Sequence, residues 1–237
     1  MMEPAPERRE FASGAELAAA FAAWTADWLR SAIEARGVAL LVVSGGSTPK
    51  RYFQALSTEP LDWARVAITL ADERRVPDDS PRSNARLVRE NLLVGPAARA
   101  EFAPLADSRL PPERELAAAG ARVARLPMPA DLLVLGMGDD GHTASWFPHA
   151  AGLAEAMDPA ARSLVASIAP PDGLEPRLTL TGRAILRARR LALQIEGAEK
   201  LATLARAMEP GPVEDMPIRA VLRQAADRLT IFSAASS

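Results

Sequence analysis

The chain has 237 residues, 49% of them hydrophobic, and a net charge of −2 from 28 Lys and Arg against 30 Asp and Glu. This length and composition suffice for a packed core in one large domain or two small ones. The near balance of charge gives no overall attraction to nucleic acid or to an anionic membrane, so we expect neither as a partner. With no cysteine and only two histidines, disulfides and cysteine nucleophiles are excluded and we expect no metal site.

The hydrophobic residues are distributed through the chain and form no run of eighteen that could span a membrane. The first ten residues are charged and contain proline, which does not fit a signal peptide. We therefore expect a cytoplasmic protein. The arginine-rich stretch 183–190 fits a solvated helix face better than a nucleic-acid-binding patch.

The first expected helix begins at a capping box, Ser13 to Glu16, and its apolar stripe runs to a stop at Gly37. Apolar runs after it predict buried strands at 38–43, 66–70, 132–135, 164–168, 191–195 and 229–232. Helical patterns separate most of these strands, at 49–56, 84–93, 112–126, 182–188, 198–208 and 218–226.

This alternation predicts an α/β fold with a doubly wound, mostly parallel sheet and helices on both faces. Proline-rich spots at 111–112, 170–171 and 210–217 fit surface loops, and none is long enough for a convincing domain linker. We therefore expect residues 1–237 to form a single domain.

The most informative segment is GMGDDGHTASWFP, residues 136–148, which directly follows a predicted strand. Its first six residues fit the dinucleotide fingerprint, but Asp139 and Asp140 would repel a pyrophosphate and no acidic residue closes a second strand about twenty residues on. We interpret it instead as a turn that holds His142 at a cleft, with Asp140 near enough to orient the imidazole as a base. A loop histidine that only caps the next helix is the alternative.

A second polar loop, SGGSTP at residues 44–49, follows the first predicted strand. Its glycines allow close backbone approach, Ser47 and Thr48 add donors, and a helix N-terminus follows, so the loop resembles a phosphate cradle. It lacks the spacing and lysine of a Walker loop, which favours a sugar phosphate over a nucleotide triphosphate. A purely structural glycine-serine turn remains the alternative.

Two further polar segments follow other predicted strands. Asp72 and Glu73 could hold sugar hydroxyls and Arg74 could bind a phosphate or carboxylate, although surface ion pairing is the simpler interpretation. Lys200 lies in the first turn of a predicted helix, where a cation opposes the helix dipole, so an anionic ligand would explain it better than an ordinary exposed lysine. Loops at the carboxyl ends of parallel strands converge on one crevice.

Together these segments resemble the 6-phosphogluconolactonase family, in the family's order and over nearly the whole chain. The matching motifs are SGGSTP at 44–49, ADERRVP at 71–77 with SN at 83–84, GMGDDGHTASWFP at 136–148, RLTLT at 177–181 and EGAEK at 196–200. The resemblance implies a single α/β domain related to glucosamine-6-phosphate deaminases and ribose-5-phosphate isomerases. It also implies hydrolysis of 6-phosphogluconolactone in the oxidative pentose phosphate pathway, without a metal or other cofactor.

By motif, the resemblance implies His142 as the base, supported by Asp140. The implied substrate contacts are Gly45, Gly46, Ser47, Thr48 and Lys200 at the phosphate, Asp72 and Arg74 nearby, and Arg177 less directly. A lactone is an activated ester, so its hydrolysis needs a positioned water, a base and oxyanion donors. Backbone N–H groups at 138–141 are candidates for those donors. A serine-hydrolase interpretation is weaker, because Ser145 lies in no G-x-S-x-G elbow.

Two rival functions remain. The related deaminases carry an Asn-Glu pair where this chain has Trp146 and Phe147, and the missing carboxylate argues against deamination or isomerisation. Related sugar-phosphate domains also serve as effector-binding halves of transcriptional regulators. A non-catalytic sugar-phosphate sensor would therefore be possible, although the retained Asp140 and His142 argue against it.

Overall fold

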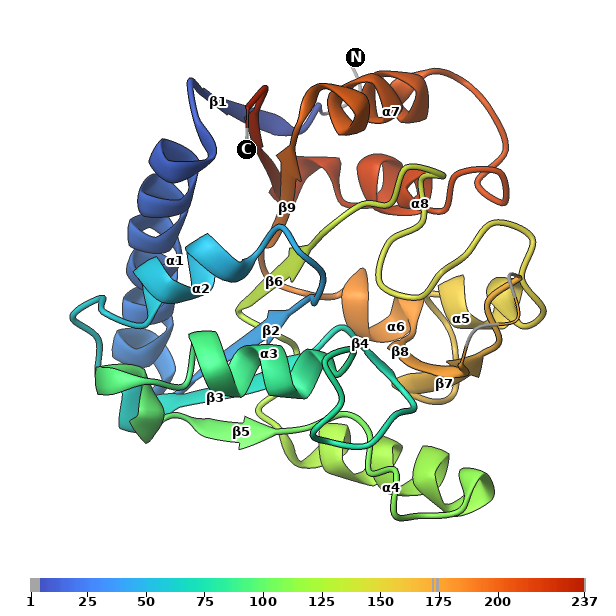
Figure 1. Cartoon of the computed structure of the whole chain (residues 1–237), viewed down its shortest axis with the longest axis horizontal. Helices are drawn as coiled ribbons and strands as arrows, with labels where there is room; N and C mark the ends of the chain where they lie inside the picture. Colours follow the sequence, from blue (N-terminus) through green and yellow to red (C-terminus); the bar gives the residue numbers. More distant parts are fainter. Residues whose placement is uncertain (1–4, 172, 174, 237) are drawn as a thin grey trace.

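The computed structural model describes residues 5–171, 173 and 175–236. Its main feature is a seven-stranded sheet in the order β1-β10-β9-β6-β2-β3-β5, in which every neighbouring pair is parallel (Figure 1). The strands span Glu7–Phe11 (β1), Ala39–Val43 (β2), Val66–Leu70 (β3), Glu101–Ala103 (β5), Leu132–Leu135 (β6), Leu191–Glu196 (β9) and Leu229–Ala234 (β10).

The connections of this sheet run in two directions. From β2 the chain crosses to β3 on one side, whereas from β6 it crosses to β9 and then β10 on the other. Because such crossovers are right-handed, the helices that follow β2 and β9 cover opposite faces of the sheet. The adjacent strands β2 and β6 therefore form the topological switch point, where open α/β sheets bind ligands beyond the strands' carboxyl ends.

The described residues form eight α-helices. They are α1 (Gly14–Arg36), α2 (Lys50–Leu56), α3 (Asn84–Asn91), α4 (Pro112–Arg125), α5 (Leu153–Met157), α6 (Gly182–Ile185), α7 (Ala198–Met208) and α8 (Ile218–Gln224). Helices α1 and α2 pack together at the left of Figure 1, while α7 and α8 lie at the upper right. The predicted doubly wound sheet with helices on both faces is confirmed.

Helix α1 shows how local sequence sets these boundaries. The Ser13 hydroxyl accepts the N–H of Glu16 at 3.2 Å, and Gly37 ends the helix in the left-handed region at φ 80°. Both predicted ends are confirmed, since serine is a favoured N-cap and glycine a favoured C-terminal stop. The helix then packs against the sheet through Phe21, whose ring stacks on Tyr52 of α2 at 4.2 Å and on Phe232 of β10 at 4.3 Å.

A second, antiparallel sheet corrects one part of the prediction. It has the order β4-β8-β7 and is formed by Asp72–Arg74 (β4), Arg177–Leu180 (β8) and Val165–Ile168 (β7). The strand expected at 164–168 therefore exists, but it lies outside the parallel sheet. Strand β4 begins two residues after β3 ends, so the chain passes directly from the central sheet into this smaller one.

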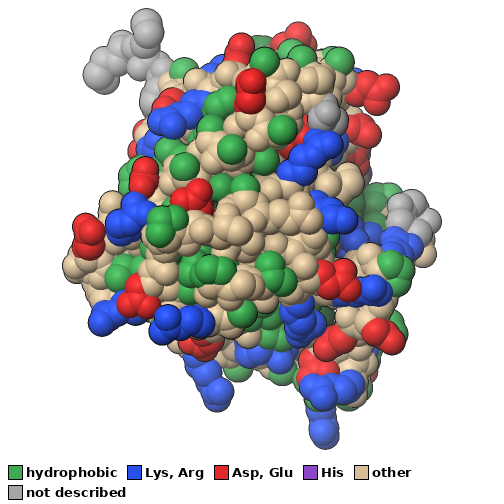
Figure 2. Space-filling view, turned by 60° about the vertical axis from the view of Figure 1, so that its left-hand side comes forward, with side chains coloured by type: hydrophobic (Ala, Val, Ile, Leu, Met, Phe, Trp, Pro, Cys, Tyr) green, Lys and Arg blue, Asp and Glu red, His purple; other side chains and the backbone are tan. Residues whose placement is uncertain are grey.

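On the face shown in Figure 2, acidic and basic side chains are interspersed and neither sign forms a large patch. No helix among the described residues is long and apolar enough to cross a membrane.

Candidate active site

The loops after β2 and β6 enclose a cavity of about 200 Å³ at the switch point. Its lining combines the 44–49 loop, the start of the turn after β6 with His142, and Lys200 from α7. Asp72, Arg74 and Asn84 line it from the side of the smaller sheet. The predicted convergence of four separate polar segments on one crevice is therefore confirmed.

The loop 44–49 is held open toward this cavity. The Ser44 hydroxyl donates to the carbonyl oxygen of Val134 on β6 at 3.0 Å, which fixes the start of the loop. A Cβ atom at Gly45 would lie 1.8 Å from the amide oxygen of Asn84, so only glycine allows this approach. Within the described chain, the backbone N–H groups of Gly45, Gly46 and Ser47 have no hydrogen-bond acceptor. Such a run of free N–H groups suits an anion.

The turn after β6 pairs His142 with Asp140. The imidazole Nδ1 lies 2.6 Å from an Asp140 carboxylate oxygen, which also accepts the backbone N–H of His142 at 3.0 Å. A Cβ atom at Gly138 would lie 2.1 Å from Nδ1, so glycine is required for the ring to lie over the turn. The structure thus places Asp140 next to His142, as expected, and the orienting role of Asp140 stays a prediction.

The ionisation of Asp140 determines which imidazole nitrogen carries the proton. Burial works to raise the pKa of Asp140, but the hydrogen bond and charge of the His142 ring and two backbone N–H bonds outweigh it and hold the pKa below the ordinary 3.8. An ionised carboxylate can only accept a hydrogen bond, so Nδ1 must be the donor. In the neutral imidazole, Nε2 then keeps its lone pair and can act as a base.

The expected oxyanion donors at 138–141 need correction. The N–H of Gly138 donates to the carbonyl oxygen of His142 at 2.9 Å, and the N–H of Gly141 donates to the carbonyl oxygen of Gly138 at 3.0 Å. These two groups close the tight turn itself. Neither is free to stabilise a developing oxyanion.

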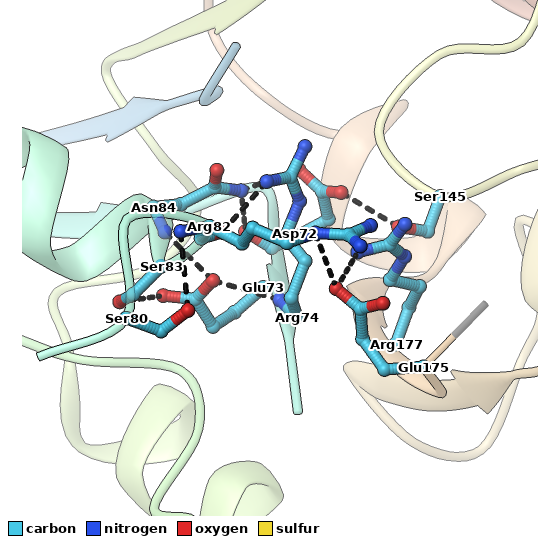
Figure 3. A network of polar contacts seen from close by, with 10 residues as sticks. All are labelled: Asp72, Glu73, Arg74, Ser80, Arg82, Ser83, Asn84, Ser145, Glu175 and Arg177. Carbon is cyan, nitrogen blue, oxygen red and sulfur yellow. Dashed lines mark hydrogen bonds and ion pairs between the residues drawn. The ribbon is translucent and has the colours of Figure 1, made fainter. Parts of the chain in front are cut away.

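Asp72 lies at the edge of the cavity in a buried polar cluster (Figure 3). One carboxylate oxygen accepts the hydroxyl of Ser145 at 2.6 Å, and the Asn84 amide donates to the Asp72 carbonyl oxygen at 2.9 Å. Ser145 is fully buried and bonded to Asp72. This environment does not resemble that of an exposed serine nucleophile.

Glu73, considered above as a partner for sugar hydroxyls, instead caps helix α3. Its carboxylate accepts the backbone N–H groups of Asn84 and Ala85 at 2.8 and 2.7 Å and the Ser83 hydroxyl at 3.1 Å. Burial raises the pKa of Glu73 even though these backbone bonds favour its charged form. Its side chain therefore positions Asn84 from behind and does not line the cavity.

The predicted cationic residues lie in different surroundings. Lys200 and Arg74 line the cavity, and Arg74 also donates to the carbonyl oxygen of Arg82 at 2.6 Å. Arg177 is only 6% exposed, is absent from this lining, and pairs with Glu175 at 3.3 Å. Its assignment as a substrate contact stays a prediction.

Among the lining residues that were not predicted as site residues, two carry buried amide side chains. Asn84 shapes the loop at Gly45, and the SN pair at the expected helix start was the available signal. Gln194 lies in β9, is 4% exposed and donates to Glu196 at 2.8 Å. A lone polar residue near the end of an otherwise apolar strand was the signal for Gln194. Within the described chain, no group of three or more His, Asp or Glu side chains is arranged to hold a metal ion.

The switch point of this open α/β sheet carries a run of free backbone N–H groups and a histidine–aspartate pair. These features are typical of a protein that binds a small anionic molecule and performs acid–base chemistry on it. Comparison with known proteins makes this class specific. Residues 12–231 match the family model described as glucosamine-6-phosphate isomerases/6-phosphogluconolactonase. The chain belongs to this family.

Individual relatives agree with this membership. The chain is 49% identical over 204 residues to a 6-phosphogluconolactonase of Rhizobium meliloti, covering 86% of this chain and 88% of the relative. It is 47% identical over 211 residues to one of Pseudomonas aeruginosa, covering 89% of each. A crystal structure of a 6-phosphogluconolactonase from Shewanella baltica matches with a TM-score of 0.92 and 40% identity over the whole of both chains.

Proposed function

We propose that this protein hydrolyses 6-phospho-D-glucono-1,5-lactone to 6-phospho-D-gluconate, the reaction of the oxidative pentose phosphate pathway. The observation that carries the proposal is the 2.6 Å contact between His142 Nδ1 and Asp140, in a cavity that the anion-binding loop also lines. The names of the relatives point to the same reaction.

In the proposed mechanism, the phosphate lies against the free N–H groups of Gly45, Gly46 and Ser47 and near Lys200. Lysine and backbone N–H groups are strong donors to phosphate oxygens. The phosphate is remote from the reacting carbon, so its binding energy orients the lactone rather than activating it. Arg74 and Asp72 line the same cavity and are assigned to the anionic and hydroxyl parts of the substrate.

His142 acts as the general base. Nε2 takes a proton from a water molecule as that water attacks the lactone carbonyl, while the Asp140 carboxylate holds Nδ1–H and stabilises the imidazolium that forms. Collapse of the tetrahedral intermediate breaks the ring C–O bond, and the imidazolium returns the proton to the leaving oxygen. No covalent enzyme intermediate is needed, because the ester is already activated.

The related deaminase reaction is the second candidate, and the structure of the 146–147 pair weighs against it. Trp146 is fully buried and donates its indole N–H to the carbonyl oxygen of Leu180 at 3.1 Å, while Phe147 packs beside the His142 ring. Neither position offers a carboxylate that could assist the imidazole in opening a sugar ring. A sensor without catalysis would not need an oriented base.

The test is the rate at which the lactone, generated in situ, disappears above its spontaneous hydrolysis.

We also propose a cytoplasmic location and action without nucleic acid, membrane, metal or cofactor, on the composition given above. Retention of activity after exhaustive chelation tests the absence of a metal requirement.

A further inference from the structure

The ring of Phe147 lies next to both His142 and a buried arginine. Its centroid is 4.8 Å from that of the His142 imidazole, with the two rings inclined at 45°. The guanidinium carbon of Arg177 lies over the same Phe147 ring, 6.0 Å from its centroid. One half-buried aromatic side chain therefore links the turn after β6 to strand β8.

Arg177 is itself held by an acidic residue. Glu175 accepts a hydrogen bond from Arg177 at 3.3 Å and pairs with Arg82 at 3.0 Å (Figure 3). Desolvation and the charge of Arg74 lower the pKa of Arg177, so the guanidinium lies in an environment that poorly solvates its charge. The π face of Phe147 offers a buried cation a favourable contact.

The imidazole of His142 needs the support of Phe147 because its hydrogen bond to Asp140 holds only one edge of the ring. The hydrogen bond from Nδ1 to Asp140 fixes where that edge lies, but the ring can still pivot about the bond. Gly138 supports the ring with its backbone alone, because a Cβ there would lie 2.1 Å from Nδ1. Contact with Phe147 restricts the tilt that the hydrogen bond leaves free.

We propose that Phe147, supported by Arg177, is a positioning residue that keeps the His142 imidazole in the orientation in which Nδ1 faces Asp140 and Nε2 is left for the substrate. This inference rests on the proposed role of His142 as the base. It gives Arg177 a task that fits its burial and its absence from the cavity lining.

The first arm of the test is kinetic. Phe147→Leu keeps an apolar side chain but removes the flat ring, and we expect kcat to fall about 10- to 100-fold, the scale of a small misplacement of a reacting group. KM should change little, because the phosphate contacts lie elsewhere. Phe147→Tyr keeps the ring face and should restore most of kcat.

A matched control is available far from the cavity. Phe102 is also half-buried, and the guanidinium carbon of Arg89 lies 5.4 Å from its ring centroid. Phe102→Leu makes the same change in a similar arginine–phenylalanine pair and should leave kcat unaltered. A similar loss of kcat in both leucine variants would show a general effect on stability and overturn the inference.

The second arm needs no substrate. In ¹⁵N spectra of the imidazole, the His142 Nδ1–H of the free wild-type protein should give one distinct signal bonded to Asp140, and Phe147→Leu should shift or broaden it. If kcat falls while the His142 signals stay as in the wild type, Phe147 acts on the substrate and the inference is wrong. If the wild type hydrolyses no lactone yet the signals respond to Phe147→Leu, the positioning stands and only the proposed function fails.

Discussion

At the residue scale, Asp140 illustrates how a single side chain couples structure to ionisation. Burial alone would raise its pKa above 3.8, and the net lowering depends mainly on the imidazole of His142. We therefore expect a ¹³C titration of the Asp140 carboxyl to have its midpoint below 3.8 in the wild type and at a higher pH in His142→Ala.

The direction of this change in the pKa of Asp140 follows from the interaction that His142→Ala removes. Without the imidazole hydrogen bond and charge, only the two backbone N–H bonds oppose the effect of burial, so the pKa of Asp140 should rise. Asp107 provides an internal control, because hydrogen bonds from Arg109 hold the pKa of Asp107 at about 2. The titration midpoint of Asp107 should be the same in both proteins. An unchanged midpoint for Asp140 would contradict the assigned pair.

Substitution of Lys200 tests phosphate recognition separately from the chemical step. Lys200→Ala should weaken the transition-state binding of the phosphorylated lactone by about 1.5–3 kcal/mol, the range for a hydrogen bond to a charged group. Unphosphorylated gluconolactone should lose little, because it has no phosphate for the lysine to bind. The measurement is kcat/KM for both lactones, and equal losses would show that the lysine has a structural or catalytic role.

At the scale of elements, the loop after β2 depends on the close contact of Gly45 with Asn84. A methyl group at residue 45 would overlap the amide of Asn84, which is held by Asp72 and by the capped start of α3. Gly45→Ala should therefore displace the loop and raise KM for the phosphorylated lactone more than it lowers kcat.

Gly120→Ala is the matched control for this substitution. Gly120 lies within α4, and a Cβ there would meet only the Ser163 hydroxyl at an ordinary 3.8 Å. Alanine in a helix interior is favoured over glycine by about 0.5–1 kcal/mol, so this variant should be stabilised and kinetically normal. A Gly45→Ala protein with wild-type KM would remove the loop from phosphate binding.

The elements predicted from sequence were those with strong periodicity or a continuous apolar run. Strands β2 and β6 are unbroken apolar segments, and β3 is interrupted only by Thr69, because all residues of these strands are buried. Helix α7 was located to its first and last residue. Strands β1, β4, β5 and β8 were missed. Charged residues dominate β1 and β4, whereas β5 and β8 are only three and four residues long. Their pairing depends on partners distant in sequence, which local pattern cannot reveal.

The candidate site was predictable where a residue type has one obvious chemical use. The glycines and hydroxyls of the 44–49 loop indicated a phosphate-binding loop, and His142 in the turn after β6 indicated the base. The capping role of Glu73 and the burial of Arg177 were not predictable, since each depends on a contact between separate segments. The engaged N–H groups of Gly138 and Gly141 likewise follow from the closure of one particular turn.

For the whole molecule, the choice between hydrolase and deaminase follows from the 146–147 pair. Glucosamine-6-phosphate should bind weakly through its phosphate and inhibit lactone hydrolysis competitively, yet release no ammonia above background. The reason is that neither Trp146 nor Phe147 can assist His142 in proton transfer to a ring oxygen. Sustained ammonia release by the purified wild-type protein would overturn this distinction.

The most direct test of the central claim compares the purified wild type with His142→Asn on 6-phosphogluconolactone generated in situ. The wild type should consume the lactone well above its spontaneous rate, and His142→Asn should lower kcat about 100-fold or more with KM little changed, the scale of general-base loss. His149→Asn is the control, because that histidine is 69% exposed and pairs with Asp215. A wild-type protein that adds nothing to spontaneous hydrolysis, or a His142→Asn variant with near wild-type turnover, would contradict the account.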